Sequence, residues 1–159
     1  MVHIYTDGGC SGNPGPGGWA YVIIRTEDPQ REEEGKGEPA LLAEKWGAER
    51  STTNNRMELS AVINALEVMP AHCRESEKVT LYTDSQYVQK GMTIWIEAWK
   101  SKGWKTSGKE PVKNKDLWVR LDALAVNFPI TWVWVKGHAG NEYNERCDFL
   151  TQKAIASLL

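Results

Sequence analysis

The sequence Val-His-Ile-Tyr-Thr-Asp-Gly-Gly, residues 2–9, begins with strand-forming side chains and ends at an acid and two glycines. This composition predicts a strand over Val2–Thr6 that runs into a turn at Asp7. Residues 11–18 are rich in glycine and proline and predict a loop. The apolar run that follows, Trp19–Arg25, predicts a second strand. The chain therefore opens with two strands, and an acid lies near the end of the first one.

Beyond residue 25 the pattern changes from strands to an alternation of helices and strands. A third strand is expected within residues 39–49, although residues 40–45 also suit a helix. Apolar positions then recur at three- and four-residue steps over Asn54–Met69, which marks one face of a helix. The remaining elements are expected at Val79–Thr83 (strand), Gln86–Lys100 (helix, broken near Gly91), Asn114–Val126 (helix), Ile130–Val135 (strand) and Glu142–Leu158 (helix). This order predicts an α/β fold: a five-stranded mixed sheet, with three antiparallel strands plus parallel strands, flanked by helices.

The composition limits the classes of protein to be considered. A chain of 159 residues is most simply one domain over residues 1–159, and its 41% hydrophobic and 25% charged residues are ordinary for a globular protein. Three cysteines without a C-x-x-C pair argue against a disulfide framework or a zinc site, and they fit a cytoplasmic protein. The chain has no apolar run of about 18 residues and no signal-peptide pattern, so no membrane span is expected. Because the net charge is −2, nucleic-acid binding must depend on local clusters of charge.

Four acids occupy positions where the predicted elements can bring them together. Asp7 and Asp84 lie at the ends of predicted strands, and Glu58 and Asp148 lie in the early turns of predicted helices. Asp7 and Asp84 come side by side if the first and fourth strands are parallel neighbours. Glu58 shares the sheet-facing stripe of its helix, where a lone carboxylate is costly unless it is paired or binds a cation. Clustered carboxylates repel one another, and oxygen ligands without histidines or cysteines suit Mg²⁺ or Mn²⁺. Taken singly, such acids are more often turn or capping residues.

Short motifs around these acids carry a family resemblance. They are YTDGGCSGNPGPGG at residues 5–18, TTNNRMEL at 52–59, YTDSQYV at 82–88, VKGHAG at 135–140 and NERCD at 144–148. In this order they resemble the type 1 ribonucleases H, close to the bacterial members of that family. Each motif alone is moderately specific, but together they span nearly the whole chain.

The resemblance implies a ribonuclease-H-like fold and an enzyme. That enzyme is an endonuclease that hydrolyses the RNA strand of RNA–DNA hybrids by two-metal-ion catalysis, leaving 5′-phosphate and 3′-hydroxyl ends. The resemblance implies Asp7, Glu58, Asp84 and Asp148 as the catalytic carboxylates that bind two Mg²⁺ ions, with Mn²⁺ able to substitute. It also implies that His138 assists proton transfer or product release, whereas His138 alone would be taken as a solvated loop residue. A monomer with no membrane partner is expected.

The same resemblance implies contacts to the hybrid. Cys10, Asn13, Asn54, Asn55 and Gln86 match positions that line the minor groove, and Thr53 matches part of a pocket for a DNA phosphate. A hydroxyl beside a helix N-terminus is a physically reasonable phosphate site. The alternatives are helix capping for Asn54 and Asn55 and a small buried side chain for Cys10.

A basic segment with interleaved tryptophans lies between Trp95 and Arg120. It carries a net charge of +4 inside a chain of net −2. The segment resembles the basic protrusion of bacterial family members, which implies hybrid contacts from Trp95, Trp99, Lys100, Trp104 and Lys105. Lysines beside aromatic planes suit phosphates and sugars. The alternative is a solvated helix whose tryptophans pack on the core, as expected for Trp118.

Two matters stay open on the sequence. Residues 27–38 carry a net charge of −4 and predict a solvated hairpin tip or loop, longer than in typical bacterial family members.

The acids alone also fit other classes of protein. These are a nuclease on a related fold, such as a 3′ exonuclease or a transposase-like nuclease, a non-catalytic hybrid-binding module, and a structural α/β domain.

Overall fold

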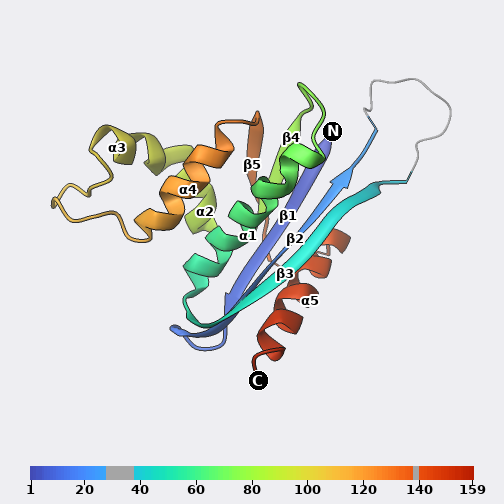
Figure 1. The fold of residues 1–159 in the computed structure, drawn as a ribbon, viewed down its shortest axis with the longest axis horizontal. Helices are drawn as coiled ribbons and strands as arrows, with labels where there is room; N and C mark the ends of the chain where they lie inside the picture. Colours follow the sequence, from blue (N-terminus) through green and yellow to red (C-terminus); the bar gives the residue numbers. More distant parts are fainter. Residues whose placement is uncertain (28–37, 138–139) are drawn as a thin grey trace.

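The computed structural model describes residues 1–27, 38–137 and 140–159. Within these ranges the chain forms a five-stranded sheet in the order β3-β2-β1-β4-β5 (Figure 1). The strands are β1 (Val2–Cys10), β2 (Gly15–Arg25), β3 (Ala40–Thr52), β4 (Val79–Thr83) and β5 (Ile130–Trp134). The β1–β2 and β2–β3 pairs are antiparallel, whereas the β1–β4 and β4–β5 pairs are parallel. The predicted α/β fold with a mixed sheet is therefore confirmed.

Helices cover both faces of this sheet. They are α1 (Asn54–Val68), α2 (Gln86–Lys90), α3 (Ile96–Ser101), α4 (Lys115–Ala125) and α5 (Glu142–Ala156), with a 3₁₀ turn at Met69–Ala71 and a π-helical turn at Gly91–Trp95. On one face α1 packs on β1 and β2, and α4 packs against α1 (Figure 1). On the opposite face α5 packs on β1, β2 and β3. In the described part of the chain, no helix combines the length and the apolar character needed to cross a membrane.

The start of β2 departs from the sequence prediction. The turn predicted at Asp7 is strand instead, because β1 continues to Cys10 and its last residues pair with β2. Residues 15–18 are predicted as loop, but they form the first part of β2, and Gly17 and Gly18 pair with β1. The prediction was wrong because close packing at this point requires residues without side chains. A Cβ at Gly18 would lie 2.8 Å from the Ala154 Cβ and 2.9 Å from the Thr151 carbonyl oxygen, both on α5. Glycine here lets β2 pair with β1 while α5 lies directly against it.

The third strand is confirmed, and the helical alternative for residues 40–45 is wrong. β3 reaches Thr52 and pairs with β2 over almost its whole length. Pairing with β2 outweighs the weak helix propensity of this segment. Most of the acidic stretch over residues 27–38 lies outside the described residues.

The predicted break near Gly91 is also confirmed, and its cause is packing. The helix after β4 changes from α to π geometry at Gly91. A Cβ at Gly91 would overlap the Trp118 ring, which is fully buried. The expectation that Trp118 packs on the core is therefore confirmed. This contact also ties α4 to the helix that follows β4.

Apolar side chains fill the space on both faces of the sheet. Ile4 and Ile23 meet Leu59 of α1 on one face, and all three are fully buried. On the other face Val22 lies in a second buried cluster with Leu150 of α5. Burying a side chain of this size contributes about 1.5–3 kcal/mol. The ends of β1 and β4 are thereby held between two packed layers.

Candidate active site

The parallel pairing of β1 and β4 places two acids side by side. Tyr5 is paired with Tyr82 in the register of these strands. Asp7 and Asp84 each lie two residues further along, so both occur where the parallel pair ends. The carboxyl ends of parallel strands are where open α/β sheets place their ligands.

Glu58 reaches the same place from α1, because Gly8 lets the helix approach the strand. A Cβ at Gly8 would overlap the backbone of Met57 and Glu58. Thr53 caps the helix, and its Oγ1 accepts a hydrogen bond from the Arg56 backbone N–H at 3.3 Å. Glu58 is thus placed in the second turn, facing β1, and its residue is only 4% exposed. The close approach of helix and strand is what buries this carboxylate.

The three acids form one cluster. One carboxylate oxygen from each of Asp7, Glu58 and Asp84 lies within 4.8 Å of the other two. Asp148 of α5 lines the same groove but does not belong to this group of three. The sequence predicts that these four acids converge. In the structure three of them form a tight group, and Asp148 lies beside it in the same groove.

Burial and mutual repulsion favour the protonated forms of the two inner acids. Burial, followed by the charges of Asp7 and Asp84, raises the pKa of Glu58 well above its usual range. Burial, followed by the charges of Asp84 and Asp148, raises the pKa of Asp7 to about 7. Near neutral pH, this group of acids therefore needs protons or cations to offset its charge.

The residues present fit divalent cations. Glu58 Oε2 is buried and has no hydrogen-bond partner among the described residues. A buried carboxylate oxygen in that state is costly unless a cation or a proton meets it. The cluster offers oxygen ligands without histidine or cysteine, which is the donor set of hard ions such as Mg²⁺ and Mn²⁺.

Several residues expected to contact a substrate line the groove beside the cluster. Asn54, Asn55 and Gln86 lie along it together with the four acids. Thr53 is the capping residue of α1, so neither Asn54 nor Asn55 provides the cap. The capping alternative for the two asparagines is therefore wrong, and their side chains can serve another purpose.

Cys10 and Asn13 lie near the start of α1 and do not line the groove that holds the acids. Cys10 lines an adjoining hollow with Asn54 and is half-buried, and its Sγ donates to the carbonyl oxygens of Gly15 and Thr52 at 3.2 and 3.3 Å. Asn13 Oδ1 accepts a hydrogen bond from the Asn54 backbone N–H at 3.3 Å. The loop after β1 is therefore tied to the start of α1.

The tryptophans of the basic segment form an aromatic cluster. Tyr87, Trp95, Trp99 and Trp118 make a closed set of ring contacts with centroid separations of 5.1–6.1 Å. The Tyr87 hydroxyl accepts a hydrogen bond from Trp118 Nε1 at 3.0 Å. Trp99 and Trp104 pack against the buried core. These rings therefore hold the basic protrusion, defined as residues 95–120, against the body of the protein.

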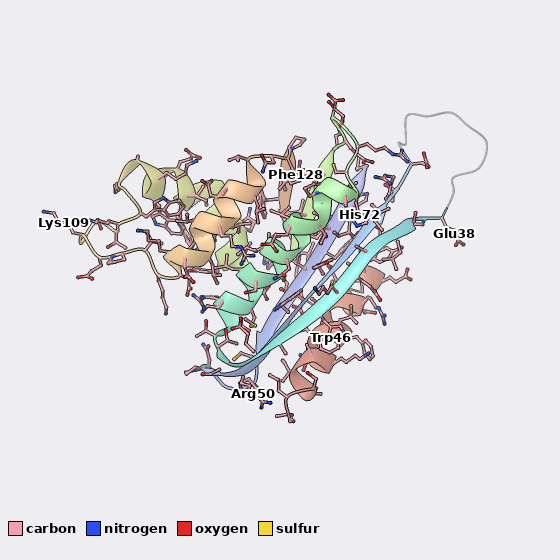
Figure 2. The ribbon with its side chains drawn as sticks, in the orientation of Figure 1. Glu38, Trp46, Arg50, His72, Lys109 and Phe128 are labelled. Atoms are coloured by element: carbon pink, nitrogen blue, oxygen red, sulfur yellow. The ribbon has the colours of Figure 1, made fainter. Side chains whose placement is uncertain are left out.

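The lysines of the protrusion differ in their surroundings. Lys100 is half-exposed and lies 3.4 Å from an Asp122 carboxylate oxygen and 3.8 Å from one of Glu97. Lys105 is exposed, and Lys109 lies at the outer end of the protrusion (Figure 2). Positive charge available to a partner is therefore concentrated toward the tip.

Other residues of the groove were missed by sequence analysis. Gln152 and Tyr87 line it beside the acids, and Asn144 and Glu145 line the adjoining hollow between Asp84 and Asp148. Gln152 could have been found, because it lies one helical turn beyond Asp148 and therefore on the same face. His138 lies outside the described residues, and the structure places only the loop residues on either side of it.

Oxygen ligands at the ends of parallel strands suit a divalent-cation-dependent α/β enzyme, and this is the class of protein that the fold and the site define. The sequence profile of the RNase H family matches residues 1–156. A ribonuclease H of Treponema pallidum subsp. pallidum is 54% identical over 151 residues, which cover 95% of this chain and 88% of that protein. The chain belongs to the RNase H family, whose members depend on divalent metal ions.

Solved structures agree with this assignment. LC9-RNase H1, a type 1 RNase H with the type 2 active-site motif, superposes with a TM-score of 0.83 at 33% identity, covering 99% of this chain and 73% of that one. LC11-RNase H1, solved in complex with an RNA/DNA hybrid, superposes with a TM-score of 0.70 at 27% identity, covering 99% and 98% of the two chains. The protein is therefore an enzyme with the RNase H fold and a phosphodiester hydrolase.

Proposed function

We propose that Asp7, Glu58, Asp84 and Asp148 bind two Mg²⁺ ions, which Mn²⁺ can replace, and that this centre hydrolyses the RNA strand of RNA–DNA hybrids. The observation that carries the proposal is the buried Glu58 carboxylate. Its Oε2 has no hydrogen-bond partner among the described residues, and the carboxylates of Asp7 and Asp84 lie close to it. Such ions, when bound, supply a hydroxide near neutral pH and stabilise the charge on the leaving oxygen. The expected products carry 5′-phosphate and 3′-hydroxyl ends.

The protein's contribution is to hold the ligands in place before substrate binds. Asp7 and Asp84 project from neighbouring strands of one sheet, and Glu58 from a helix locked against that sheet. Ligands on rigid elements need little reorganisation during the reaction. Burial and the charges of Asp84 and Asp148 raise the pKa of Asp7 to about 7, and the negative charge of the ionised acids attracts cations.

The groove beside the acids is the proposed site of the hybrid. Asn13, Asn54, Asn55, Gln86 and Cys10 are proposed to contact the minor groove, with Thr53 at a DNA phosphate. Polar contacts to sugars and phosphates give little sequence preference, and the 2′-hydroxyl distinguishes RNA from DNA. The complex of the similar LC11-RNase H1 with an RNA/DNA hybrid supports this substrate.

His138 is proposed to assist proton transfer or product release. Support comes from its neighbour Gly137, where a Cβ would lie 3.4 Å from Asp84 Oδ2. The loop that carries His138 therefore begins beside the acidic cluster. We further propose that the protein acts as a monomeric single domain in the cytoplasm.

The decisive experiment compares Asp7→Asn and Asp84→Asn with the wild type on end-labelled RNA–DNA hybrid, RNA duplex and DNA duplex, each with and without Mg²⁺. We expect the wild type to cut only the RNA of the hybrid, at internal positions and only with metal, and both variants to lose cleavage while remaining folded. Glu75→Gln, at an exposed residue of the loop before β4 and outside the groove, is the control. Wild-type cleavage by either variant would contradict the proposal, and removal of nucleotides only from the ends would indicate an exonuclease.

The basic protrusion is proposed to contact the hybrid beyond the cleft, at its phosphates and sugars, through Trp95, Trp99, Lys100, Trp104 and Lys105. Replacing Lys100, Lys102 and Lys105 by alanine should reduce the slope of log affinity against log salt by about 2, since each neutralised phosphate contributes about 0.9 and Lys100 is already ion-paired. Replacing Lys45 and Lys78, which lie elsewhere on the surface, should leave the slope nearly unchanged. An unchanged slope in the triple variant would contradict a role of the protrusion in binding.

A further inference from the structure

Trp134 makes a hydrogen bond to the main chain of an active-site acid. It is the last residue of β5, and its indole Nε1–H donates to the backbone carbonyl oxygen of Asp84 at 3.0 Å. Asp84 directly follows β4, so this bond begins where the regular pairing of the two strands stops. The Trp134 side chain therefore adds a hydrogen bond between the two strands beyond their last paired residues.

The backbone around Asp84 is held by a short series of such bonds. The Val135 backbone N–H donates to the Thr83 carbonyl oxygen at 2.9 Å, and the Ser85 backbone N–H donates to Thr83 Oγ1 at 3.0 Å. These two bonds hold the peptides on either side of Asp84. The bond from Trp134 holds the Asp84 carbonyl group itself, so it limits rotation of the residue that carries the carboxylate.

Core packing does not account for a tryptophan at this position. Trp134 is 41% exposed and belongs to neither buried cluster, whereas Trp118 is fully buried in the core. Trp134 therefore gains less from burial than Trp118 does, and its ring fills no space in the core. What distinguishes tryptophan from other large apolar side chains is its indole N–H donor, and here that donor is used on Asp84.

We propose that Trp134 is a positioning residue for the Asp84 carboxylate and, through it, for metal binding. The proposal rests on the function proposed above. Turning the Asp84 peptide would move its carboxylate relative to those of Asp7 and Glu58, whose oxygens lie within 4.8 Å of it. Partners that orient metal ligands typically change metal affinity or activity by about 10–100-fold when they are removed.

The test is Trp134→Phe, which keeps an aromatic ring and removes the donor. The matched control is Trp46→Phe on β3, where the Trp46 ring faces Lys153 and lies away from the groove. Mg²⁺ binding is measured by calorimetry without substrate, and kcat and KM are measured on an RNA–DNA hybrid. We expect Trp134→Phe to bind Mg²⁺ about 10-fold more weakly and to lose about 10-fold in kcat with little change in KM. Trp46→Phe should match the wild type in all three quantities.

A second measurement does not depend on how any variant folds. The Trp134 indole N–H, assigned through bonds in the wild-type spectrum, should exchange with D₂O at least about 10-fold more slowly than a free indole, because it is hydrogen-bonded. Exchange at the free rate would overturn the inference, as would Mg²⁺ affinity and kcat in Trp134→Phe equal to those of the control. A wild-type protein that binds no Mg²⁺ would instead contradict the proposed function, so the two failures can be told apart.

Discussion

At the carboxyl ends of β1 and β4 three carboxylates lie within 4.8 Å of one another, whereas at the amino ends of the same strands a carboxylate is surrounded by donors. There Glu77, just before β4, accepts hydrogen bonds from Arg25 Nε and Nη2, each at 2.9 Å. The Met1 ammonium lies 3.4 Å from Glu77, and the Arg74 backbone N–H donates to it at 3.0 Å. Positive and negative charges are therefore paired at the amino ends of these strands, whereas only negative charges gather at the carboxyl ends.

The pKa values of the two ends move in opposite directions. The hydrogen bond from Arg25 lowers the pKa of Glu77 to about 2. Burial and the charge of Asp84 raise the pKa of Asp7 to about 7. The amino end therefore stabilises the fold when Glu77 is ionised, and the carboxyl end destabilises it when Asp7 is ionised. A sheet that gathers like charges at one end must be stabilised elsewhere. The paired charges at the amino ends are therefore structural, whereas the clustered acids at the other end indicate a functional site.

The largest effect is expected of Gly8→Ala, which disrupts the acidic cluster at the carboxyl ends of the strands. The added methyl group overlaps the backbone of Met57 and Glu58, so α1 must move away from β1. We expect a loss of about 3 kcal/mol in the free energy of unfolding and a loss of cleavage of at least about 100-fold, because Glu58 leaves the cluster. Gly9→Ala is the control, since its nearest contact would be an ordinary 3.6 Å from Thr151 Cγ2. Equal effects of the two substitutions, measured by urea unfolding and hybrid cleavage, would contradict this account of Gly8.

Glu77→Gln tests how much the ion pair at the amino ends of β1 and β4 stabilises the fold. Because the pKa of Glu77 is lowered to about 2, its contribution is fully present above its unfolded pKa of 4.5 and is lost as the pH falls toward 2. We expect the variant to lose about 2 kcal/mol in the free energy of unfolding at about pH 7, and the difference from the wild type to shrink below about pH 4.5. Glu75→Gln, at an exposed residue of the same loop, should have little effect. A difference that is independent of pH would contradict the ion-pair explanation.

The smallest effect is expected at the carboxyl end, and it has the opposite sign. The raised pKa of Asp7 means that stability falls as the pH rises from about 4 to about 7, because the folded state must release a proton that it holds more tightly than the unfolded chain does. In EDTA at about pH 8, Asp7→Asn should raise the free energy of unfolding by roughly 1–2 kcal/mol, since screening in the open groove reduces the full effect. The gain should vanish near pH 4. Destabilisation by Asp7→Asn in EDTA at pH 8 would contradict repulsion at this site.

Sequence analysis was most successful where a pattern repeats along one element. The helical period identified α1 and its sheet-facing stripe, and the expected parallel pairing of the first and fourth strands indicated where Asp7 and Asp84 would meet. It was wrong for residues 15–18, because glycine content signals a loop unless a neighbouring helix needs the space. It also missed Trp134, because nothing local indicates that an indole N–H will reach the Asp84 carbonyl oxygen.

The sequence by itself determined the order of strands and helices, the family and the acids that we propose carry the chemistry, because periodicity and motifs are properties of neighbouring residues. The tertiary structure alone decided how closely those acids approach, which of them is buried and which tryptophans hold the protrusion. These depend on contacts between residues far apart in the chain: α1 against Gly8, Trp118 against Gly91, and β5 against Asp84. Burial and the separation between charges are fixed only when such contacts form, and they set the pKa values of the acids and the metal affinity that we propose for the site.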